Sequence, residues 1–333
     1  MPLAQLHLDA ALCNPTNWDD LVHISAHVVG KRRSKLSHLR FFWKARQPLE
    51  LEKVQLLGEG SYGRVFGVTA RTRGGRLLYF CAKVRKGREA LDEAQAVRLP
   101  NLRRCRGLLP VHMAHPSEVA VLPWVLGSLG QHQGALTLTQ AVKVSMEVRR
   151  ALACLGKHGL HYLDVNDANV LLGCRGSSSS SSAGSPRVVE VFLGDVGSLV
   201  PDPESGEYTF TYRLPAFWAA KPVPGRSVGL RTQKEVEAMY DQLVAVLLLE
   251  CTEYPGVHSR LVKAKKSESL EEVEQHARKL ANRVAELERR LRAGEAHGVW
   301  RRKGLAACEV LLALVAEMPS RWRQRLAARG LAV

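Results

Sequence analysis

A glycine-rich run at residues 58–68 has the residue types needed to hold the phosphates of a nucleotide. It reads Gly-Glu-Gly-Ser-Tyr-Gly-Arg-Val-Phe-Gly-Val, with glycines at Gly58, Gly60 and Gly63. Glycines let a backbone turn tightly and approach phosphate oxygens without a Cβ clash. Lys83 follows in an apolar stretch, Phe-Cys-Ala-Lys-Val, and its ammonium could neutralise the inner phosphates. The glycine pattern is weak by itself, because glycine-rich turns are common.

A carboxylate and an amide five residues apart could carry a second part of the chemistry. Asp164 and Asn169 lie in Tyr-Leu-Asp-Val-Asn-Asp-Ala-Asn, residues 162–169, before an apolar Val-Leu-Leu. Asp164 could accept the proton of an attacking hydroxyl, and Asn169 could ligate a metal ion from the same loop. The spacing alone occurs often by chance, so its meaning depends on the neighbouring motifs.

A second acidic turn follows the next apolar stretch. Asp195 lies in Gly-Asp-Val-Gly, residues 194–197, directly after Val-Phe-Leu. Its carboxylate could ligate Mg²⁺ and so neutralise phosphate charge. An isolated Asp-x-Gly sequence indicates an ordinary β-turn, so this motif too gains its meaning from its company.

The elements around the glycine run decide what kind of nucleotide loop it is. Apolar stretches at Val54–Leu57 and Val65–Val68 predict two strands joined as a hairpin. Leu77–Val84 predicts a third strand, which carries Lys83. A dinucleotide-binding fingerprint would instead open a helix.

The remaining periodicity predicts further strands and several helices. The predicted strands are Val119–Leu122, Val170–Leu172 and Val188–Leu193, and the predicted helices are Glu89–Arg98, Ala141–Gly156, Glu235–Cys251 and Gly304–Met318. Between two of the strands, Arg175–Pro186 contains six consecutive serines and cannot build a packed core. We expect a disordered insertion there, either a flexible spacer or a phosphorylated segment.

Apolar residues repeat every three or four positions over residues 270–291, between runs of Glu, Lys and Arg. The repeat spans about three heptads, which is the short limit for a coiled coil. We therefore favour an amphipathic helix lying on its own domain, and a coiled-coil homodimer is the alternative.

These motifs occur in the order found in protein kinases, and residues 51–260 resemble that superfamily. The resemblance rests on the glycine hairpin, Lys83, the loop of Asp164 and Asn169, Asp195, and Thr-Phe-Thr-Tyr-Arg-Leu-Pro-Ala at residues 209–216. It implies an α+β, two-lobed fold with a small β-rich N-lobe and a larger helical C-lobe. The divergence of the chain is similar to that of kinases of large DNA viruses.

The resemblance divides the chain into three parts. We expect a basic N-terminal extension at 1–50, a kinase N-lobe at 51–126 and a C-lobe at 127–333. The C-lobe would contain the insertion at 175–186 and a C-terminal helical region from about residue 266.

The resemblance also implies a role for each site residue. ATP would be bound by Leu57, Gly58, Glu59, Gly60, Ser61, Tyr62, Gly63, Arg64, Val65, Lys83, Pro123 and Val125. Asp164, Lys83 and Asn169 would be catalytic, and Asn169 and Asp195 would hold Mg²⁺, with Mn²⁺ as an alternative. Glu93 would pair with Lys83, with Glu89 as the alternative. Thr209 and Pro215 would belong to the activation segment.

Asp241 resembles the aspartate that braces the kinase catalytic loop from a long buried helix. An aspartate in front of so apolar a helical stretch could equally be a partner of the helix dipole.

Several positions depart from the family pattern. Tyr162 and Leu163 replace the usual His and Arg, so an activation-segment phosphate would lack its receiving charge. Asn166 replaces a lysine that stabilises the γ-phosphate, which predicts a lower rate. Val196 replaces Phe, and Ala216 replaces a Glu of a buried ion pair. We therefore expect activity that does not depend on phosphorylation of the activation segment.

The net charge of +16 is concentrated in the first third of the chain. Such a surface attracts acidic protein segments, which favours acidic protein substrates, or it is simply a solvated basic face. Lys31–Lys35 fits a nuclear localisation signal. Nucleic acid is not expected as the main partner, because no nucleic-acid-binding motif accompanies the charge.

Cysteine usage and hydropathy indicate the compartment. The 7 cysteines form no C-x-x-C pair, which favours a reducing compartment over a disulfide framework or a zinc site. We expect no signal peptide and no membrane span, hence an intracellular protein, in the host cell if the chain is viral.

The function implied is transfer of the ATP γ-phosphate to serine or threonine hydroxyls of proteins. A nucleotide-binding pseudokinase or scaffold is one alternative, against which the presence of Lys83, Asp164, Asn169 and Asp195 speaks. A small-molecule phosphotransferase is another, since such enzymes share the Asp-x-x-x-x-Asn spacing. The full glycine hairpin and the Tyr-Arg-Leu-Pro of residues 212–215 speak against it.

Overall fold

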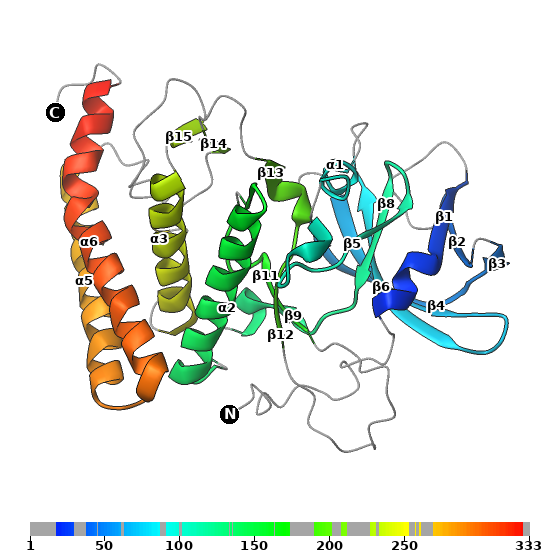
Figure 1. Cartoon of the computed structure of the whole chain (residues 1–333), viewed down its shortest axis with the longest axis horizontal. Coiled ribbons are helices and arrows are strands. Elements are labelled where there is room, and N and C mark those ends of the chain that lie inside the picture. The colour runs from blue at the N-terminus through cyan, green and yellow to red at the C-terminus, as the bar shows by residue number, and fades with distance from the viewer. Residues whose placement is uncertain are drawn as a thin grey trace. The chain divides into compact units, whose positions relative to one another are not determined.

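Figure 1 labels most of the helices and strands of the protein, which is described by a computed structural model. The described residues are 18–29, 38–44, 46–60, 63–86, 91–99, 102–132, 134, 136–162, 164–173, 190–201, 208–211, 227–230, 233–252, 257, 260 and 269–328. The predicted insertion at 175–186 and the basic run Lys31–Lys35 lie outside them. The chain divides into a first unit, Met1–Gly127 with Leu171–Leu199, and a second unit, Ser128–Val170 with Val200–Val333.

An antiparallel five-stranded sheet is the centre of the first unit. Its order is β4 (Glu50–Glu59), β5 (Gly63–Arg71), β6 (Leu77–Arg85), β8 (Val119–Pro123) and β7 (His112–His115). The predicted glycine hairpin is confirmed, since β4 and β5 are antiparallel neighbours on either side of the glycine run. Val65 stands opposite Lys83, and Lys83 opposite Ala120. Residues opposite one another share a face of the sheet, so these three side chains emerge on the same side.

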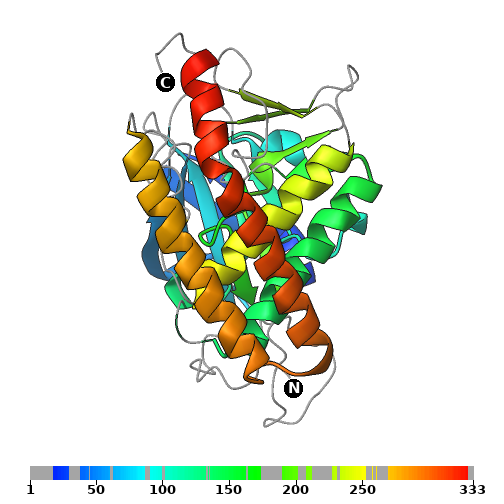
Figure 2. The same ribbon diagram turned by 90° about the vertical axis from the view of Figure 1, so that its left-hand side faces the viewer.

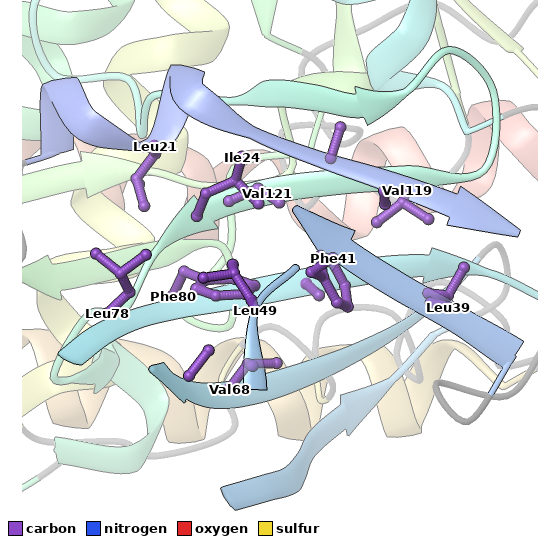
Figure 3. Close-up of a cluster of buried hydrophobic side chains, with 14 of the residues drawn as sticks. Leu21, Ile24, Leu39, Phe41, Leu49, Val68, Leu78, Phe80, Val119 and Val121 are labelled. Carbon is purple, nitrogen blue, oxygen red and sulfur yellow. The ribbon is translucent and has the colours of Figure 1, made fainter. Parts of the chain in front are cut away.

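The other face of this sheet is buried under the N-terminal strands. After η1 (Trp18–His23), β1 (Ile24–Val28), β2 (Leu39–Trp43) and β3 (Gln47–Pro48) form a three-stranded sheet. Its side chains share one hydrophobic core with the larger sheet. Figure 3 shows Ile24 and Phe41 packed among Val68, Phe80 and Val121.

This core differs from the extension that we expected over residues 1–50, because the described part of that stretch is folded. Leu39, Phe41 and Trp43 are buried and alternate with the exposed Arg40 and the half-buried Phe42. That is the two-residue period of a strand. The period was obscured in the sequence because Phe42, on the outer side, is also apolar.

Shorter elements complete the first unit. They are α1 (Glu93–Ala96), η3 (Leu102–Arg104), η5 (Val196–Ser198) and a three-stranded sheet in the order β12 (Glu190–Leu193), β11 (Val170–Gly173) and β9 (Gly127–Ser128). α1 is a single turn, shorter than the helix predicted over Glu89–Arg98, of which residues 89–90 lie outside the described part. The predicted strand Val188–Leu193 is seen from Glu190 onward.

Helices dominate the described part of the second unit. They are α2 (Leu138–Lys157), α3 (Gln233–Thr252), α5 (Leu270–Arg292) and α6 (Gly298–Ala328). The remaining elements are η4 (Leu129–His132), β10 (Leu160–Tyr162), β13 (Leu199–Pro201) and the antiparallel pair β14 (Tyr208–Thr211) and β15 (Ser227–Leu230). A capping box starts α2: the Thr137 hydroxyl accepts the N–H of Gln140, and the Gln140 side chain accepts the N–H of Thr137. The helices predicted over 141–156, 235–251 and 304–318 are thereby confirmed.

The heptad pattern of residues 270–291 is buried within the chain's own second unit. Val273, Leu280, Val284 and Leu287 of α5 are at most 2% exposed. α5 and α6 lie side by side as a helical hairpin, as Figure 2 shows in orange and red. The pattern thus builds an amphipathic helix packed on its own unit, which was the favoured prediction. None of the helices in the described ranges is long and apolar enough to cross a membrane.

Candidate active site

Lys83 on β6 meets two carboxylates of the first unit. Its Nζ is ion-paired with Oε1 of Glu93, on α1, and lies 2.7 Å from Oδ1 of Asp195. The Glu93 side chain is only 2% exposed and that of Lys83 15%, whereas Asp195 is 36% exposed. Lys83, assigned to phosphate binding, therefore contacts both Asp195, assigned to metal binding, and its predicted partner Glu93. Glu89, the alternative partner, lies outside the described residues.

The electrostatics of this group favour the charged form of the lysine. Burial by itself would lower the pKa of Lys83, but the attraction of Glu93 and Asp195 outweighs it, and the pKa is raised. The ammonium is therefore present throughout the neutral range, as a point charge for a phosphate requires.

The turn that carries Asp195 is in close contact with the start of α1. A Cβ on Gly197 would lie 2.6 Å from Cβ of Asp92 and 3.4 Å from the backbone N of Glu93. Asp195 itself has a left-handed backbone, with φ 44° and ψ 59°. Aspartate is among the few residues that tolerate this conformation. Close packing between η5 and α1 thus brings the Asp195 and Glu93 side chains to one ammonium.

The glycine hairpin lies beside this group on β4 and β5. The N–H of Gly60 donates to the carbonyl of Gly63 at 2.9 Å. Oε2 of Glu59 lies 3.0 Å from Nε of Arg64, and Oε1 lies 2.5 Å from Nζ of Lys86. These cations lower the pKa of Glu59, Lys86 most strongly. Ser61 and Tyr62 lie outside the described residues.

The glycines of the hairpin differ in what surrounds them. A Cβ on Gly58 would meet no atom within 4 Å, and one on Gly60 would meet only the Gly63 carbonyl at 3.9 Å. A Cβ on Gly63 would lie 3.0 Å from the carbonyl of Val84. Packing therefore explains the glycine at position 63 but not those at positions 58 and 60. A ligand that approaches the backbone closely would explain glycine at these two positions.

An apolar cluster lies on the same face of the sheet as Lys83. Its buried members are Cys81, Leu109, Leu122 and Phe192, and Trp18, Val65, Val111, Trp124, Val125 and Leu171 pack against them half-buried. Burial raises the pKa of the Cys81 thiol to about 12, although the N–H of Val125 opposes the shift. A Cβ on Gly67 would lie 2.7 Å from the Trp124 ring, so Gly67 leaves room for this indole.

This cluster includes two predicted nucleotide contacts, Val65 and Val125, and several residues that sequence analysis missed. Cys81 could have been found, because it precedes Lys83 by two residues and so shares its face. For Trp124 and Leu171, no local sequence pattern indicates that they belong to this cluster. Leu57 lies on β4 with a side chain that is 39% exposed, and Pro123 ends β8.

In the second unit, Asp164 and Asn169 are joined directly by hydrogen bonds. Nδ2 of Asn169 donates to the Asp164 carbonyl at 2.8 Å and to its Oδ2 at 2.9 Å. The bonds use the nitrogen of the amide and leave its oxygen as the atom that could ligate a metal ion. Leu163 lies outside the described residues.

Asn166 holds this loop together from inside. Its Oδ1 accepts the N–H groups of Ala168 and Asn169, both at 3.0 Å, and its Nδ2 donates to the Asp164 carbonyl at 3.2 Å. The asparagine at the position of the kinase lysine is therefore a structural part of the loop, in the manner of an Asx turn.

Asp241 does not brace the loop, and this expectation was wrong. Its Oδ1 pairs with Nε of Arg149 on α2 at 2.7 Å, and the side chain is 49% exposed. Arg149 also pairs with Glu237, one turn earlier on α3. The alternative, a helix-dipole partner, is excluded as well, because Asp241 lies in the middle of α3 and not at its start.

The residues predicted to form an activation segment are only partly described. The backbone of Thr209 lies in β14, which pairs with β15. Pro215 and Ala216 lie outside the described residues.

The units together form a mixed α+β protein, with a β-rich first unit and a helical second unit, compatible with a two-lobed fold. No protein-family model matches the chain. A curated protein of Encephalitozoon cuniculi (strain GB-M1), described as a probable CTD kinase subunit alpha homolog, is 24% identical over 196 residues, or 54% of this chain and 53% of that protein. The chain thus spans about half the length of this relative. The similarity is weak, and it is kinase-related.

Proposed function

We propose that this chain is an ATP- and Mg²⁺-dependent protein kinase that phosphorylates serine or threonine. The observation that carries the proposal is the contact of the Lys83 ammonium with both Glu93 and Asp195. Glu93 would hold the lysine in place, and Lys83 would bind the inner phosphates of ATP. The kinase-related similarity supports the same class of activity.

In this proposal, the apolar cluster and the segment that follows β8 bind the base of ATP. Val65, Cys81 and Leu122 would cover the apolar face of the purine. Val125 would donate its backbone N–H to the purine edge, since Pro123 has no N–H to offer. Gly58 and Gly60 would let the hairpin backbone approach the phosphates.

The residues of the second unit would act on the substrate hydroxyl. The hydroxyl oxygen forms a bond to the γ-phosphorus, the bond from phosphorus to the ADP oxygen breaks, and Asp164 receives the hydroxyl proton. Asn169 would orient Asp164 through its two hydrogen bonds. Mg²⁺, held by Asp195 and Asn169, would neutralise the charge that develops on the phosphates.

The finer specificity rests on two features of the sequence. A threonine in the activation segment, Thr209, favours serine or threonine over tyrosine. The net charge of +16 favours acidic protein substrates. The likeness to kinases of large DNA viruses, the intracellular location and nuclear import through Lys31–Lys35 stay predictions.

The test is transfer of label from γ-³²P-ATP to casein, histone and the enzyme itself. Asp164→Asn is compared with wild type, and Asp241→Asn is the matched control, since it makes the same change at an exposed aspartate. We expect label on serine and threonine with wild type and Asp241→Asn, and a loss of at least about a hundredfold with Asp164→Asn. No label above the Asp164→Asn background on any of these proteins would overturn the proposal.

The inward-turned Asn166 gives some weight to a nucleotide-binding pseudokinase, because no lysine serves the γ-phosphate from that position. Calorimetric titration with MgATP separates the two functions. Binding without transfer would favour the pseudokinase, and transfer with measurable turnover would exclude it.

A further inference from the structure

We infer that Tyr240, rather than Asp241, positions the catalytic loop for the proposed phosphoryl transfer; the inference rests on the proposed function. The N–H of Tyr162 donates to the Tyr240 hydroxyl at 2.9 Å. The same hydroxyl donates to the carbonyl of Tyr162 at 3.3 Å. One side chain of α3 therefore bonds both backbone groups of the last residue of β10.

Both partners of this contact are fixed by burial. Tyr162 is 0% exposed and Tyr240 1%. Around Tyr240 the helix is buried as well, with Val236 0%, Met239 2% and Leu243 2% exposed. Hydrogen bonds are electrostatically stronger in such a dry interior than in water, and a packed phenol ring has no alternative rotamer to adopt.

The contact is close enough in the chain to govern Asp164. Asp164 follows Tyr162 by only two positions, so the chain between them spans at most roughly 7 Å. A shift of the end of β10 is therefore transmitted to the carboxylate. On its other side, Asp164 is held by Asn169, and the loop by Asn166. Asp164 is thus fixed from two directions, by α3 through Tyr240 and by its own loop.

Neighbouring positions on a helix cannot share this task. Consecutive residues of an α-helix point about 100° apart. Tyr240 is turned toward β10, whereas Asp241 is turned toward Arg149. The ion pair of Asp241 ties α3 to α2 at the surface, and the hydroxyl of Tyr240 ties α3 to the loop in the interior.

The experiment removes one oxygen atom from the full-length protein. Tyr240→Phe deletes the hydroxyl and keeps the ring, Asp241→Asn changes the neighbouring surface contact, and Ser145→Ala deletes another buried hydroxyl, which donates to the Val142 carbonyl on α2. We expect kcat of Tyr240→Phe to fall roughly 10- to 100-fold, since a misplacement of about 1 Å costs that much. KM for ATP should stay within about twofold, and both controls should keep kcat and KM.

Hydrogen–deuterium exchange provides a readout that does not need activity. The backbone amide of Tyr162 should exchange at least about tenfold faster in Tyr240→Phe, because its acceptor is gone, and at the wild-type rate in both controls. Circular dichroism at the assay temperature establishes the folded fraction.

The outcomes separate the inference from the proposed function. An unchanged kcat per folded molecule in Tyr240→Phe, or an equal fall in Ser145→Ala, would overturn the positioning role. If wild type transfers no phosphate, the proposed function fails. Hydrogen exchange still tests the contact in that case, because an unchanged exchange rate of the Tyr162 amide in Tyr240→Phe would show that the Tyr240 hydroxyl does not hold β10. The inference is supported if, in Tyr240→Phe, the Tyr162 amide exchanges faster and kcat falls while KM for ATP is unchanged.

Discussion

Gly197 and Asp92 are packed so closely that a β-carbon on the glycine would lie 2.6 Å from Cβ of Asp92. The turn of Asp195 therefore touches the helix of Glu93 through backbone and β-carbons. This contact holds both carboxylates at the distance from Lys83 that the ion pairs require. α1 is also a single turn, so it has little length through which to absorb a displacement.

Gly197→Ala should weaken nucleotide binding. The added methyl has no space, and the overpacking costs about 1–3 kcal/mol. If α1 takes up the whole shift, the affinity for MgATP falls roughly 5- to 150-fold. Calorimetric titration measures the change. Gly74→Ala is the control, since its nearest neighbour, Oγ1 of Thr72, would be 4.0 Å away. An unchanged affinity in Gly197→Ala would show that α1 does not depend on this contact.

Lys83→Met should destabilise the first unit more than the double variant Lys83→Met/Glu93→Leu. The single change leaves a carboxylate that is 2% exposed without its cation, at a cost of about 3 kcal/mol. Removing both charges relieves that cost. Urea unfolding measures both, with Lys86→Met, half-exposed beside Glu59, as the control expected to cost less than about 1 kcal/mol. Simple additivity of the two changes would contradict the prediction.

The stability that the charge of Lys83 contributes should disappear at alkaline pH. Its pKa in the folded protein is raised above the ordinary value of 10.5. The folded state therefore holds this proton more tightly than the unfolded state. The stability that the charge contributes is complete below the ordinary pKa and is lost as the pH rises through the raised pKa. The difference in unfolding free energy between wild type and Lys83→Met should be constant from pH 7 to about 10 and shrink above it. A difference that grows with pH has the wrong sign for this ion pair.

Phe41→Ala should cost about 3–5 kcal/mol of unfolding free energy, because the side chain is 1% exposed in the core between the two sheets. Phe42→Ala should cost less than half as much, since the half-buried Phe42 packs in a tilted arrangement against His27 at the outer side of β2. Chemical denaturation measures the unfolding free energy of both variants and so compares two adjacent phenylalanines on opposite faces of β2. Equal costs would mean that residues 39–43 do not form the buried strand of Figure 3.

Local patterns predicted the parts of the site that depend on neighbours in sequence. The glycine hairpin and the position of Lys83 on the third strand follow from alternating apolar residues and turn chemistry. The need of Lys83 for a carboxylate partner followed from the resemblance, and Glu93 was preferred to Glu89 because it precedes an inward apolar position by one helical turn.

The features that were missed depend on contacts between distant segments. Trp18 packs on Phe192 with ring centroids 4.9 Å apart, and no pattern links residues so far apart in sequence. Tyr240 and Asp241 differ by one position, and the sequence of a helix buried on most sides does not fix which residue faces the loop. The strand Leu39–Trp43 was missed because the apolar Phe42 breaks its apparent alternation.

The exposure of β4 bears on how a nucleotide could enter and leave. Nearly all of its residues are exposed, including Val54 at 43% and Leu56 at 52%, while β5 and β6 carry the core. Peeling this edge strand away would break ladder hydrogen bonds but would remove little apolar surface from the core, chiefly that of the half-buried Leu51. The burial of apolar surface is the dominant force that holds a fold together. In the proposed kinase, β4 would therefore serve as a lid whose opening leaves the rest of the first unit intact, and product would be released without unfolding the strands β5 and β6, of which β6 carries Lys83.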